Sequence, residues 1–331
     1  MDRHRNPTVN PAALVLAEGL TPIPQQVQIK PAFVSRYQTL LGDRYDDFLQ
    51  HSLSYSTKSI RVNTLKITVA ALKRRLEKDW TLTPVTWCKE GFFLQYKHGK
   101  RFDLGNLPEH QLGLMYVQDA ASMIPPVVLD PRPGEMVLDL CAAPGSKTTQ
   151  LAMYMKNTGV LVANDVTGDR LTPLGLNIQR CGIMNTLITL RANRFLSPVF
   201  DKVLIDAPCS GTGTIRRSLK TLQMWSPSLI ARMVAEQRML IEQGFSVLKP
   251  GGVMVYSTCT QEPEENEGLI TWFLHRHPDA DLLPIELDIK RSEPVMEFEG
   301  QTYSPSVANC LRIYPQDNDT EGFFVAKVRK K

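Results

Sequence analysis

The sequence predicts an α/β protein whose main part is a doubly wound, largely parallel sheet, preceded by a smaller α+β domain. Three observations support this. Apolar strand-like runs alternate with helix-like segments beyond residue 116, a strand, helix, strand, strand order comes before them, and 331 residues exceed the usual size of one core. We therefore expect an N-terminal arm at residues 1–29, a small α+β domain at 30–115 and a large domain at 116–331.

Composition restricts the class of protein. Hydrophobic residues make up 43% and charged residues 22% of the chain, as in ordinary globular proteins, and no apolar run is long enough to span a bilayer. The first residues, MDRHRNPTVNP, lack the apolar core of a secretory signal, so we expect a soluble, cytoplasmic protein. We also expect a monomer. A net charge of +4 permits a polyanionic partner without requiring one.

The cysteines are spaced without any metal-binding pattern. No C-x-x-C pair and no histidine at zinc-finger spacing accompanies them, so no metal site is expected. In a reducing compartment each would be a thiol, and the ordinary interpretation of any one is a small buried apolar residue. The six are Cys88, Cys141, Cys181, Cys209, Cys259 and Cys310.

The region before residue 116 mixes helix and strand signals. Helices are expected between Lys30 and about Ser54, a strand at SIRVNTLKI (Ser59–Ile67), an amphipathic helix at TVAALKRRLEKDW (Thr68–Trp80) and a strand-like segment at GFFLQY (Gly91–Tyr96). The resulting small sheet could serve as a platform for RNA. A purely structural cap on the larger domain is an equally good interpretation.

In the large domain, strands and helices alternate. Strands are expected within EMVLDLCAAPG (Glu135–Gly145), GVLVANDV (Gly159–Val166), TLITLRA (Thr186–Ala192), KVLIDAP (Lys202–Pro208) and GGVMVYSTC (Gly251–Cys259), with helices from about Ser146, near Asp169–Cys181 and at about Pro227–Leu248. Such sheets bind ligands at the carboxyl ends of their strands, where the strand order reverses. The residues of interest lie at those ends.

The first strand runs into the turn CAAPGSKT (Cys141–Thr148), which exposes backbone amides at the start of the next helix. It is not a P-loop, because Ser146 follows Gly145 where a lysine would be required, and a dinucleotide G-x-G-x-x-G is absent. Near the end of the second strand, Asp165 is placed to accept hydrogen bonds from ribose hydroxyls. A helix cap is the equally supported alternative for Asp165.

Two cysteine motifs follow neighbouring strands. DAPCSGTG (Asp206–Gly213) ends the fourth predicted strand and STCT (Ser257–Thr260) ends the fifth. Because these strands are adjacent in this topology, we expect the thiols of Cys209 and Cys259 to face one cleft beside Asp206. The alternative, two buried spacer cysteines, is weakened because each lies in a turn rich in Ser, Pro and Gly.

Together, CAAPGSKT, DAPCSGTG and YSTCT resemble the motifs of the RNA 5-methylcytosine methyltransferase family, also called the Sun/Fmu family, from about Ser59 to the C-terminus. The resemblance implies a Rossmann-like, S-adenosylmethionine-dependent methyltransferase sheet behind an RRM-like domain. Enzymes that methylate amino groups usually carry [DN]-P-P-[YF] at the fourth strand. DAPC therefore favours methylation of carbon over an exocyclic nitrogen.

The resemblance also implies a cofactor site for S-adenosyl-L-methionine. It places the first motif around the methionine part of the cofactor, through Cys141, Ala142, Ala143, Pro144, Gly145, Ser146 and Lys147. Asp165 would contact the ribose, with Arg170 close by, and Asp206 would close the site. Near the adenine, where the family usually has an acidic residue, this chain has Asn193.

The expected chemistry accounts for the residue types. C5 of cytosine is a poor nucleophile, so the Cys259 thiolate adds to C6 and makes C5 able to take the methyl group. Asp206 is the candidate for contacting N3 and the amino group of the base. The resemblance implies that Cys209 assists the final release of the base.

RNA contacts are expected from basic residues near these motifs. Arg216 and Arg217 lie where a phosphate backbone could pass, and Arg61 and Lys66 invite the same interpretation, although a solvated charged face is the alternative. Transfer RNA is the leading substrate, because no large RNA-targeting extension is seen. Ribosomal RNA is the main alternative, and a noncatalytic RNA-binding protein is the rival class. EPEENEG (Glu262–Gly268) is interpreted simply as the capped start of a helix.

Overall fold

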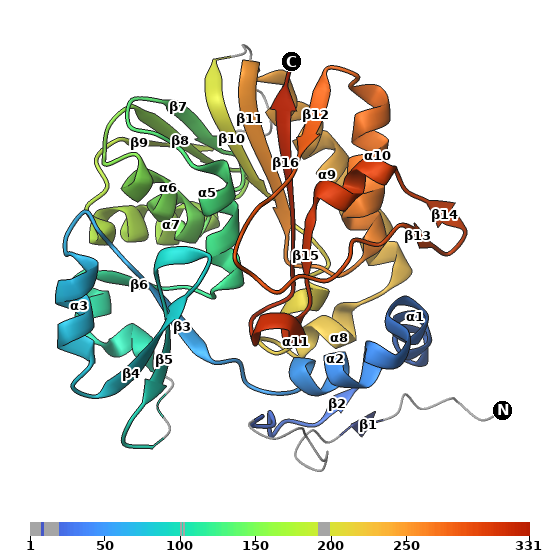
Figure 1. The fold of residues 1–331 in the computed structure, drawn as a ribbon, viewed down its shortest axis with the longest axis horizontal. Coiled ribbons are helices and arrows are strands. Elements are labelled where there is room, and N and C mark those ends of the chain that lie inside the picture. Colours follow the sequence, from blue (N-terminus) through green and yellow to red (C-terminus); the bar gives the residue numbers. More distant parts are fainter. Residues whose placement is uncertain (1–7, 10–19, 100, 102, 191–198) are drawn as a thin grey trace.

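Two sheets organise the chain in the computed structural model, which describes residues 8–9, 20–99, 101, 103–190 and 199–331. The larger sheet has the strand order β12-β16-β11-β10-β7-β8-β9, with β15 paired to β16 (Figure 1). Its strands are β7 (Met136–Asp139), β8 (Val160–Asp165), β9 (Thr186–Leu190), β10 (Phe200–Asp206), β11 (Leu248–Thr258), β12 (Ala280–Leu283), β15 (Leu311–Ile313) and β16 (Phe323–Lys330).

The strands β7 to β11 form the predicted parallel core of this sheet. β7 pairs in parallel with both β8 and β10, so the chain winds outward to one side through β8 and β9 and to the other through β10 and β11. The strand order therefore reverses between β7 and β10, and a ligand site is expected at their carboxyl ends. The doubly wound α/β prediction is confirmed.

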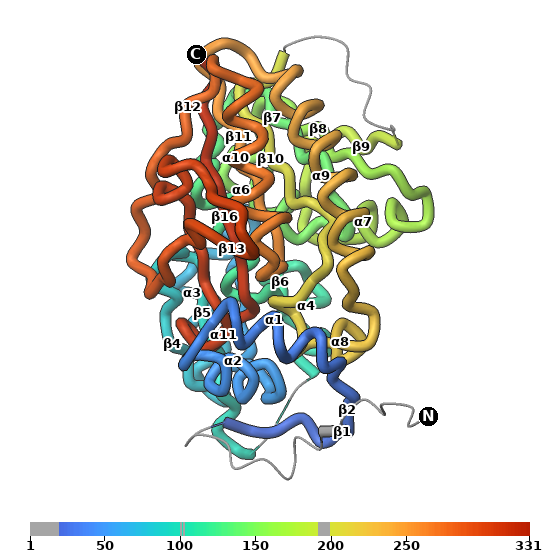
Figure 2. The backbone as a smooth tube through the Cα atoms, turned by 90° about the vertical axis from the view of Figure 1, so that its right-hand side faces the viewer, coloured from blue at the N-terminus to red at the C-terminus, as the bar shows by residue number. Residues whose placement is uncertain are grey.

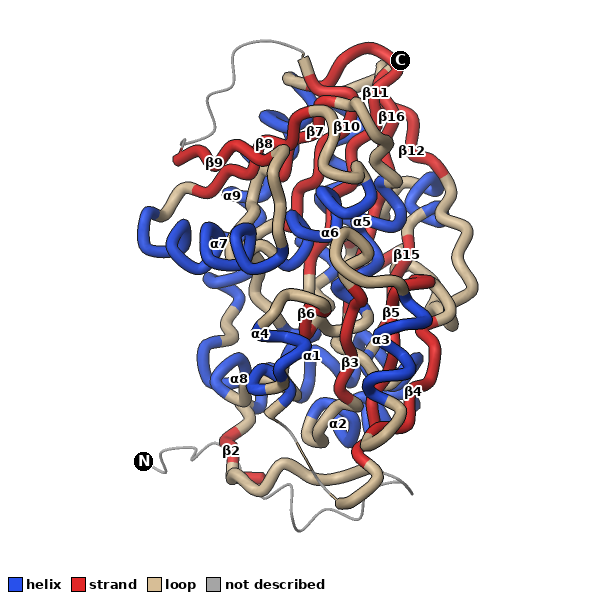
Figure 3. The backbone as a smooth tube through the Cα atoms, turned by 90° about the vertical axis from the view of Figure 1, so that its left-hand side faces the viewer, coloured by secondary structure: helices blue, strands red, loops and turns tan. Residues whose placement is uncertain are grey.

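Helices cover both faces of the sheet, which explains why its strands are apolar on both sides. On β11, Val255 packs in one core with Ile124 and Leu151, whereas its neighbour Tyr256 packs in a second core with Phe245. The helices of the first face are α5 (Ile124–Leu129), α6 (Ser146–Tyr154) and α7 (Gly168–Cys181), seen in Figure 3, and those of the second are α9 (Pro227–Ser246) and α10 (Glu267–Arg276), seen in Figure 2.

The smaller sheet is antiparallel, with the order β4-β5-β3-β6. Its elements are β3 (Lys58–Val62), α3 (Val69–Leu76), β4 (Trp80–Val85), β5 (Cys88–Tyr96), α4 (Pro108–Gln111) and β6 (Met115–Val117). This βαββαβ order is the arrangement of ferredoxin-like and RRM-like domains. The strand predicted to reach Ile67 ends at Val62, because the side chain of Asn63 turns the chain by accepting from the Leu65 N–H and donating to Gly113 O.

One face of this small sheet is buried, and the other is covered only in part. Ile60 and Phe92 pack with α3 in one core. On the opposite face Phe93 packs against the core of the large domain, whereas Thr81 and Thr83 of β4 are exposed. The structure therefore leaves both interpretations of this sheet open, a cap and a platform, with the exposed part of this face on the β4 side.

The remaining elements close the fold around the large sheet. Helices α1 (Pro31–Leu41) and α2 (Tyr45–Ser52) pack with α8 (Lys220–Met224) and α11 (Pro315–Asn318), and β1 (Thr8–Val9), β2 (Val27–Gln28), β13 (Glu297–Phe298) and β14 (Gln301–Thr302) form two short hairpin-like pairs. β12, β15 and β16, which no sequence signal predicted, are antiparallel to their neighbours. Among the described residues, no helix is both long and apolar enough to cross a membrane.

Candidate active site

Four strands end at one edge of the large sheet, and each ends at a polar residue. These last residues are Asp139 of β7, Asp165 of β8, Asp206 of β10 and Thr258 of β11. The parallel register places Asp206 directly beside Ser257. The turns that follow these strands therefore meet, as the sequence predicted.

Cys209 and Cys259 lie in contact, with 3.3 Å between their sulfur atoms. Two backbone hydrogen bonds hold the turns together, from Ala207 N–H to Ser257 O at 2.9 Å and from Gly213 N–H to Cys259 O at 2.9 Å. The predicted convergence of the two thiols is confirmed.

The two thiols are not equivalent. The hydrogen bond to Cys259 raises the pKa of Cys209 well above its ordinary value, and burial raises it further. A group whose charged form is disfavoured in this way keeps its proton. A Cys209 thiol that keeps its proton can donate to the Cys259 sulfur, which is the arrangement that a nucleophilic thiolate at Cys259 requires.

Asp206 lies beside the two thiols and is held at both of its carboxylate oxygens. Lys147 Nζ donates to one oxygen at 2.6 Å, and the Ser257 hydroxyl donates to the other at 2.9 Å. The same Lys147 ammonium donates to the Ser122 hydroxyl at 3.1 Å and lies 5.2 Å from the centre of the Phe323 ring. Lys147 therefore bridges the cofactor turn and the cysteine cleft, a position its motif alone did not indicate.

A pocket of about 380 Å³ opens between the strand ends and α9. It is lined by Leu140, Cys141, Asp165, Val166, Arg170, Pro208, Arg232, Ala235, Glu236, Met239 and Leu240. The lining residues that come from α9 were not predicted from the sequence. Their spacing of three or four residues puts them on one helical face, and the exposed Met239 on this face was the available signal.

Of the predicted cofactor turn, residues 141–147, Cys141 lines this pocket and Ser146 begins α6. Gly145 has φ of 103°, a left-handed conformation that favours glycine, and it leads directly into the helix N-terminus at Ser146. Arg170 donates to Ala143 O at 2.8 Å and lies 3.3 Å from the Asp165 carboxylate, so it braces the turn. Burial raises the pKa of Cys141 well above its ordinary value, so this thiol does not compete as a nucleophile.

Asp165 accepts hydrogen bonds from the backbone of two turns and lines the pocket. One carboxylate oxygen accepts from the N–H groups of Val166 and Thr167, and the other accepts from Ala143 N–H at 3.2 Å. The side chain thus caps the local backbone and also lines the pocket. Because each oxygen has two lone pairs, these contacts leave acceptor capacity for ribose hydroxyls.

Asp139 is a site residue that the sequence analysis did not assign. It accepts from the Thr148 hydroxyl at 2.7 Å, while its other carboxylate oxygen is buried without a partner among the described residues. Burial raises the pKa of Asp139 to about 7. An unpaired buried acceptor beside the turn, the open helix N-terminus and the adjoining pocket together fit a small cationic nucleoside cofactor.

Three of the four predicted RNA contacts are already engaged within the protein. Arg216 is wrong as a phosphate contact, because its side chain is 0% exposed and pairs with Asp319 at 2.7 Å. Arg61 is also buried, where it donates to the Thr149 hydroxyl at 2.8 Å. Lys66 is exposed but binds Arg180 O at 2.7 Å near the end of α7. Arg217, with a side chain 77% exposed, is available to RNA.

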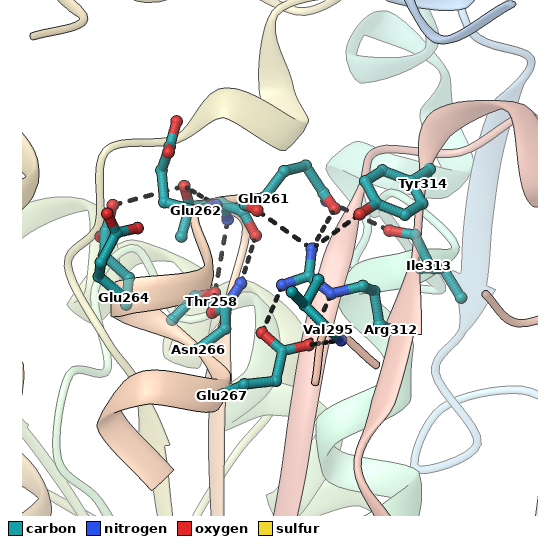
Figure 4. Close-up of polar contacts among 12 residues, drawn as sticks. Thr258, Gln261, Glu262, Glu264, Asn266, Glu267, Val295, Arg312, Ile313 and Tyr314 are labelled. Carbon is teal, nitrogen blue, oxygen red and sulfur yellow. Dashed lines mark hydrogen bonds and ion pairs between the residues drawn. The ribbon is translucent and has the colours of Figure 1, made fainter. Parts of the chain in front are cut away.

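The segment after Cys259 is not simply a capped helix start. Glu262, Glu265, Asn266 and Glu267 are all 0% exposed, and the Asn266 side chain makes no cap hydrogen bond to α10. Instead, Asn266 accepts from the Thr258 hydroxyl at 2.6 Å and donates to Thr260 O at 2.9 Å (Figure 4). These buried side chains hold the turn that carries Cys259.

An ion pair completes this network. The Arg312 guanidinium donates to both carboxylate oxygens of Glu267, at 2.8 and 2.6 Å, and both side chains are 0% exposed. Arg312 also donates to Gln261 O at 3.1 Å, which satisfies a backbone carbonyl two residues after Cys259 (Figure 4). Asn193 lies outside the described residues, and among those described no group of side chains could hold a metal ion.

The sheet order and the strand-end site define a Rossmann-like methyltransferase. A family model described as 16S rRNA methyltransferase RsmB/F matches residues 126–329, and one for the N-terminal domain of 16S rRNA methyltransferase RsmF matches residues 29–120. The chain belongs to the RNA 5-methylcytosine methyltransferase family. It is an RNA methyltransferase that uses S-adenosylmethionine and acts on cytosine.

Individual relatives agree with this assignment. The chain is 44% identical to a tRNA (cytosine(49)-C(5))-methyltransferase of Pyrococcus abyssi, over 92% of this chain and 97% of that relative. It is 42% identical to the ribosomal RNA small subunit methyltransferase F of Vibrio vulnificus, over 92% of this chain but 64% of that relative. A solved methyltransferase homologue from Pyrococcus horikoshii matches with a TM-score of 0.81 at 40% identity, covering 91% of this chain and 95% of that one.

Proposed function

We propose that the protein forms 5-methylcytosine in transfer RNA through a covalent bond between Cys259 and C6 of the base, with Cys209 aiding release. The observation that carries this proposal is the 3.3 Å contact between the two sulfur atoms, which follow neighbouring strand ends next to the pocket. Two buried spacer cysteines would not need to meet at this edge of the sheet.

The cofactor would be held by the residues that line the pocket. Asp165 would accept from the ribose hydroxyls, and the turn at residues 141–147 would enclose the methionine part, with Arg170 supporting both. When bound, S-adenosylmethionine supplies an electrophilic methyl group.

In the first half of the reaction, the Cys259 thiolate adds to C6, and the π electrons of the C5–C6 bond move toward N3. N3 then takes up a proton through Asp206, which receives it from the hydrogen-bonded Lys147 ammonium, and Lys147 is left neutral until release. C5 is now enamine-like and accepts the methyl group.

In the second half, the C5 proton passes to water and N3 returns its proton through Asp206. The C5–C6 double bond then forms again, and the bond from C6 to sulfur breaks with its electron pair leaving on the Cys259 sulfur. The thiol of Cys209 donates a hydrogen bond to the departing sulfur, because it lies 3.3 Å away and retains its proton. Release therefore depends on Cys209, while bond formation depends on Cys259.

The experiment that tests this division compares Cys259→Ala with Cys209→Ala on labelled RNA. Cys259→Ala is expected to give no methylation and no covalent complex. Cys209→Ala is expected to accumulate protein linked to methylated RNA, visible as a band that survives denaturing electrophoresis. A covalent band in Cys259→Ala and none in Cys209→Ala would reverse the two roles, and full activity in both variants would exclude this chemistry.

Transfer RNA is favoured as substrate because the Pyrococcus abyssi relative, 44% identical over 92% of this chain, is a tRNA methyltransferase. We expect bisulfite sequencing to find a cytosine in tRNA that is methylated only when the purified enzyme and cofactor are present. Methylation of 16S rRNA but not of tRNA would establish the alternative. We also propose a division of the chain into residues 1–29, 30–115 and 116–331.

A further inference from the structure

Glu265 lies beneath both cysteine turns and is fully buried. One of its carboxylate oxygens accepts from Ser210 N–H at 3.0 Å and from the Gln237 side chain at 2.7 Å. The other lies 3.5 Å from the hydroxyl of Thr260. The carboxylate thus contacts the residue that follows Cys209 and the residue that follows Cys259.

Further contacts tie these turns into one unit. The hydroxyl groups of Ser210 and Thr260 are 2.6 Å apart, and that of Thr212 lies 3.0 Å from Thr260. Gln237 of α9 donates to Pro208 O at 2.8 Å as well as to Glu265. Cys209 is therefore held on both sides, through Pro208 before it and Ser210 after it.

The neighbouring carboxylates of the same segment are directed elsewhere. Glu262 accepts from Tyr37 at 2.9 Å and from the indole of Trp225 at 2.8 Å, which anchors α1 and α8. Glu267 is fully engaged with Arg312, as Figure 4 shows. Of the buried acidic residues in this segment, Glu265 is the one that reaches the Cys209 turn.

The charge of Glu265 acts on Cys209 in the same sense as its geometry. After Cys259 and burial, Glu265 is a further cause of the raised pKa of Cys209. In its charged form, which its raised pKa of about 7 confines to neutral and higher pH, Glu265 makes the Cys209 thiolate less favourable and so keeps the proton on Cys209. It therefore maintains both the position and the protonation that release requires.

We propose that Glu265 is a positioning residue for the release step, holding the Cys209 thiol against Cys259 through the Ser210 amide and Gln237. This inference rests on the proposed roles of the two cysteines. Loss of the Glu265 carboxylate would then reproduce the loss of Cys209: addition and methylation proceed, but release slows. Because hydrogen bonds to a charged group hold the Cys209 turn, we expect their loss to slow release about tenfold or more.

The test uses the full chain and compares Glu265→Gln with Glu267→Gln, a matched change of another buried carboxylate in the same segment. Glu265→Gln is expected to bind cofactor normally and to accumulate denaturation-resistant, methylated adduct. Glu267→Gln is expected to lower stability without trapping adduct. Gln237→Leu, which removes the same support from α9, provides a second route and is also expected to accumulate adduct should Glu265→Gln fail to fold.

Three outcomes overturn the inference. If Cys209→Ala traps adduct but neither Glu265→Gln nor Gln237→Leu does, Glu265 has only a structural role. If Glu267→Gln traps as much adduct as Glu265→Gln, the effect is a general consequence of loosening the segment. If Cys209→Ala itself traps nothing, the proposed function fails together with this inference, and the cysteine variants alone reveal that.

Discussion

Arg216 and Arg217 are adjacent in the sequence, and the structure predicts opposite consequences of replacing them. The Arg216 guanidinium is buried and donates to Tyr55 O at 3.0 Å, to Thr320 O at 3.1 Å and to Asp319 at 2.7 Å. The Arg217 side chain is 77% exposed and approaches Glu321 only to 3.7 Å. One arginine is part of the fold, and the other is free to meet a ligand.

The magnitudes follow from these contacts. Arg216→Ala leaves buried carbonyl groups without donors and a space where the side chain was, which together cost about 3 kcal/mol of unfolding free energy. Arg217→Ala should change stability by less than about 0.5 kcal/mol, because an exposed ion pair at that distance contributes little. For RNA binding we expect the larger effect from Arg217→Ala. Removing one phosphate contact makes the plot of log K against log salt concentration less steep by about 1.

Thermal unfolding and RNA titrations between low and moderate salt measure both effects on the same preparations. We expect Arg216→Ala to unfold several degrees below wild type and Arg217→Ala to unfold with it. We expect only Arg217→Ala to show the reduced salt slope while it remains fully folded. If Arg216→Ala kept wild-type stability and lost the salt dependence instead, the buried contacts of Arg216 would not represent the protein in solution.

Three further changes have defined outcomes. Asp165→Ala should weaken S-adenosylmethionine binding about tenfold or more by calorimetry, because a charged acceptor for the ribose is lost, and unchanged affinity would remove Asp165 from the site. Arg312→Met should cost about 3–5 kcal/mol in urea unfolding, because Glu267 is left as a buried unpaired charge, and replacing Glu267 by Met as well should recover part of that loss. Burial raises the pKa of Glu265 from 4.5 to about 7. Below pH 4.5 this residue is protonated in both the folded and the unfolded state, and its contribution to stability is full. As the pH rises to about 7, about 3 kcal/mol of unfolding free energy is lost, because the unfolded state gives up its proton first. Glu265→Gln should flatten the pH dependence of unfolding in that range, and an unchanged slope would contradict the assignment.

The parallel part of the fold and the reacting residues could be predicted from the sequence because both follow from the strand pattern. Apolar runs flanked by turn residues locate β7, β8, β10 and β11, and the carboxyl ends of parallel strands share one edge. Once the strands are placed, the convergence of Asp206, Cys209 and Cys259 needs no knowledge of side-chain packing. Local sequence was sufficient for these residues.

The basic residues could not be placed in this way. Arg216 lies in a run that looks like a solvated face, and its partner Asp319 is 103 residues away in the sequence. Two residues that pair across so many positions of the sequence produce no periodic sequence pattern near either of them. The missed strands β12, β15 and β16 have the same origin, because their antiparallel pairing on β11 depends on where the chain returns.

The segment at residues 262–268 shows how a local pattern can be interpreted correctly in part and still miss the function. Acidic residues before an apolar helix are typical of a helix start, and α10 does begin at Glu267. Their burial, however, depends on Arg312, Trp225 and Gln237, which come from three other elements. A charge that is fully buried needs a partner, and the partner is visible only in three dimensions.

The two cysteines also show why identical side chains at equivalent strand ends need not behave alike. Their backbones are related by the parallel register of β10 and β11, so the strands alone do not distinguish them. The difference arises from what surrounds each turn. Glu265 accepts from the Ser210 N–H at 3.0 Å, directly after Cys209, and lies farther, at 3.5 Å, from the Thr260 hydroxyl after Cys259. The Cys259 contact, burial and the Glu265 charge together make the charged form of Cys209 unfavourable. The asymmetry that separates attack from release is thus built by the residues after the motifs, and exchanging Cys for Ser at either position would test the sulfur without removing that environment.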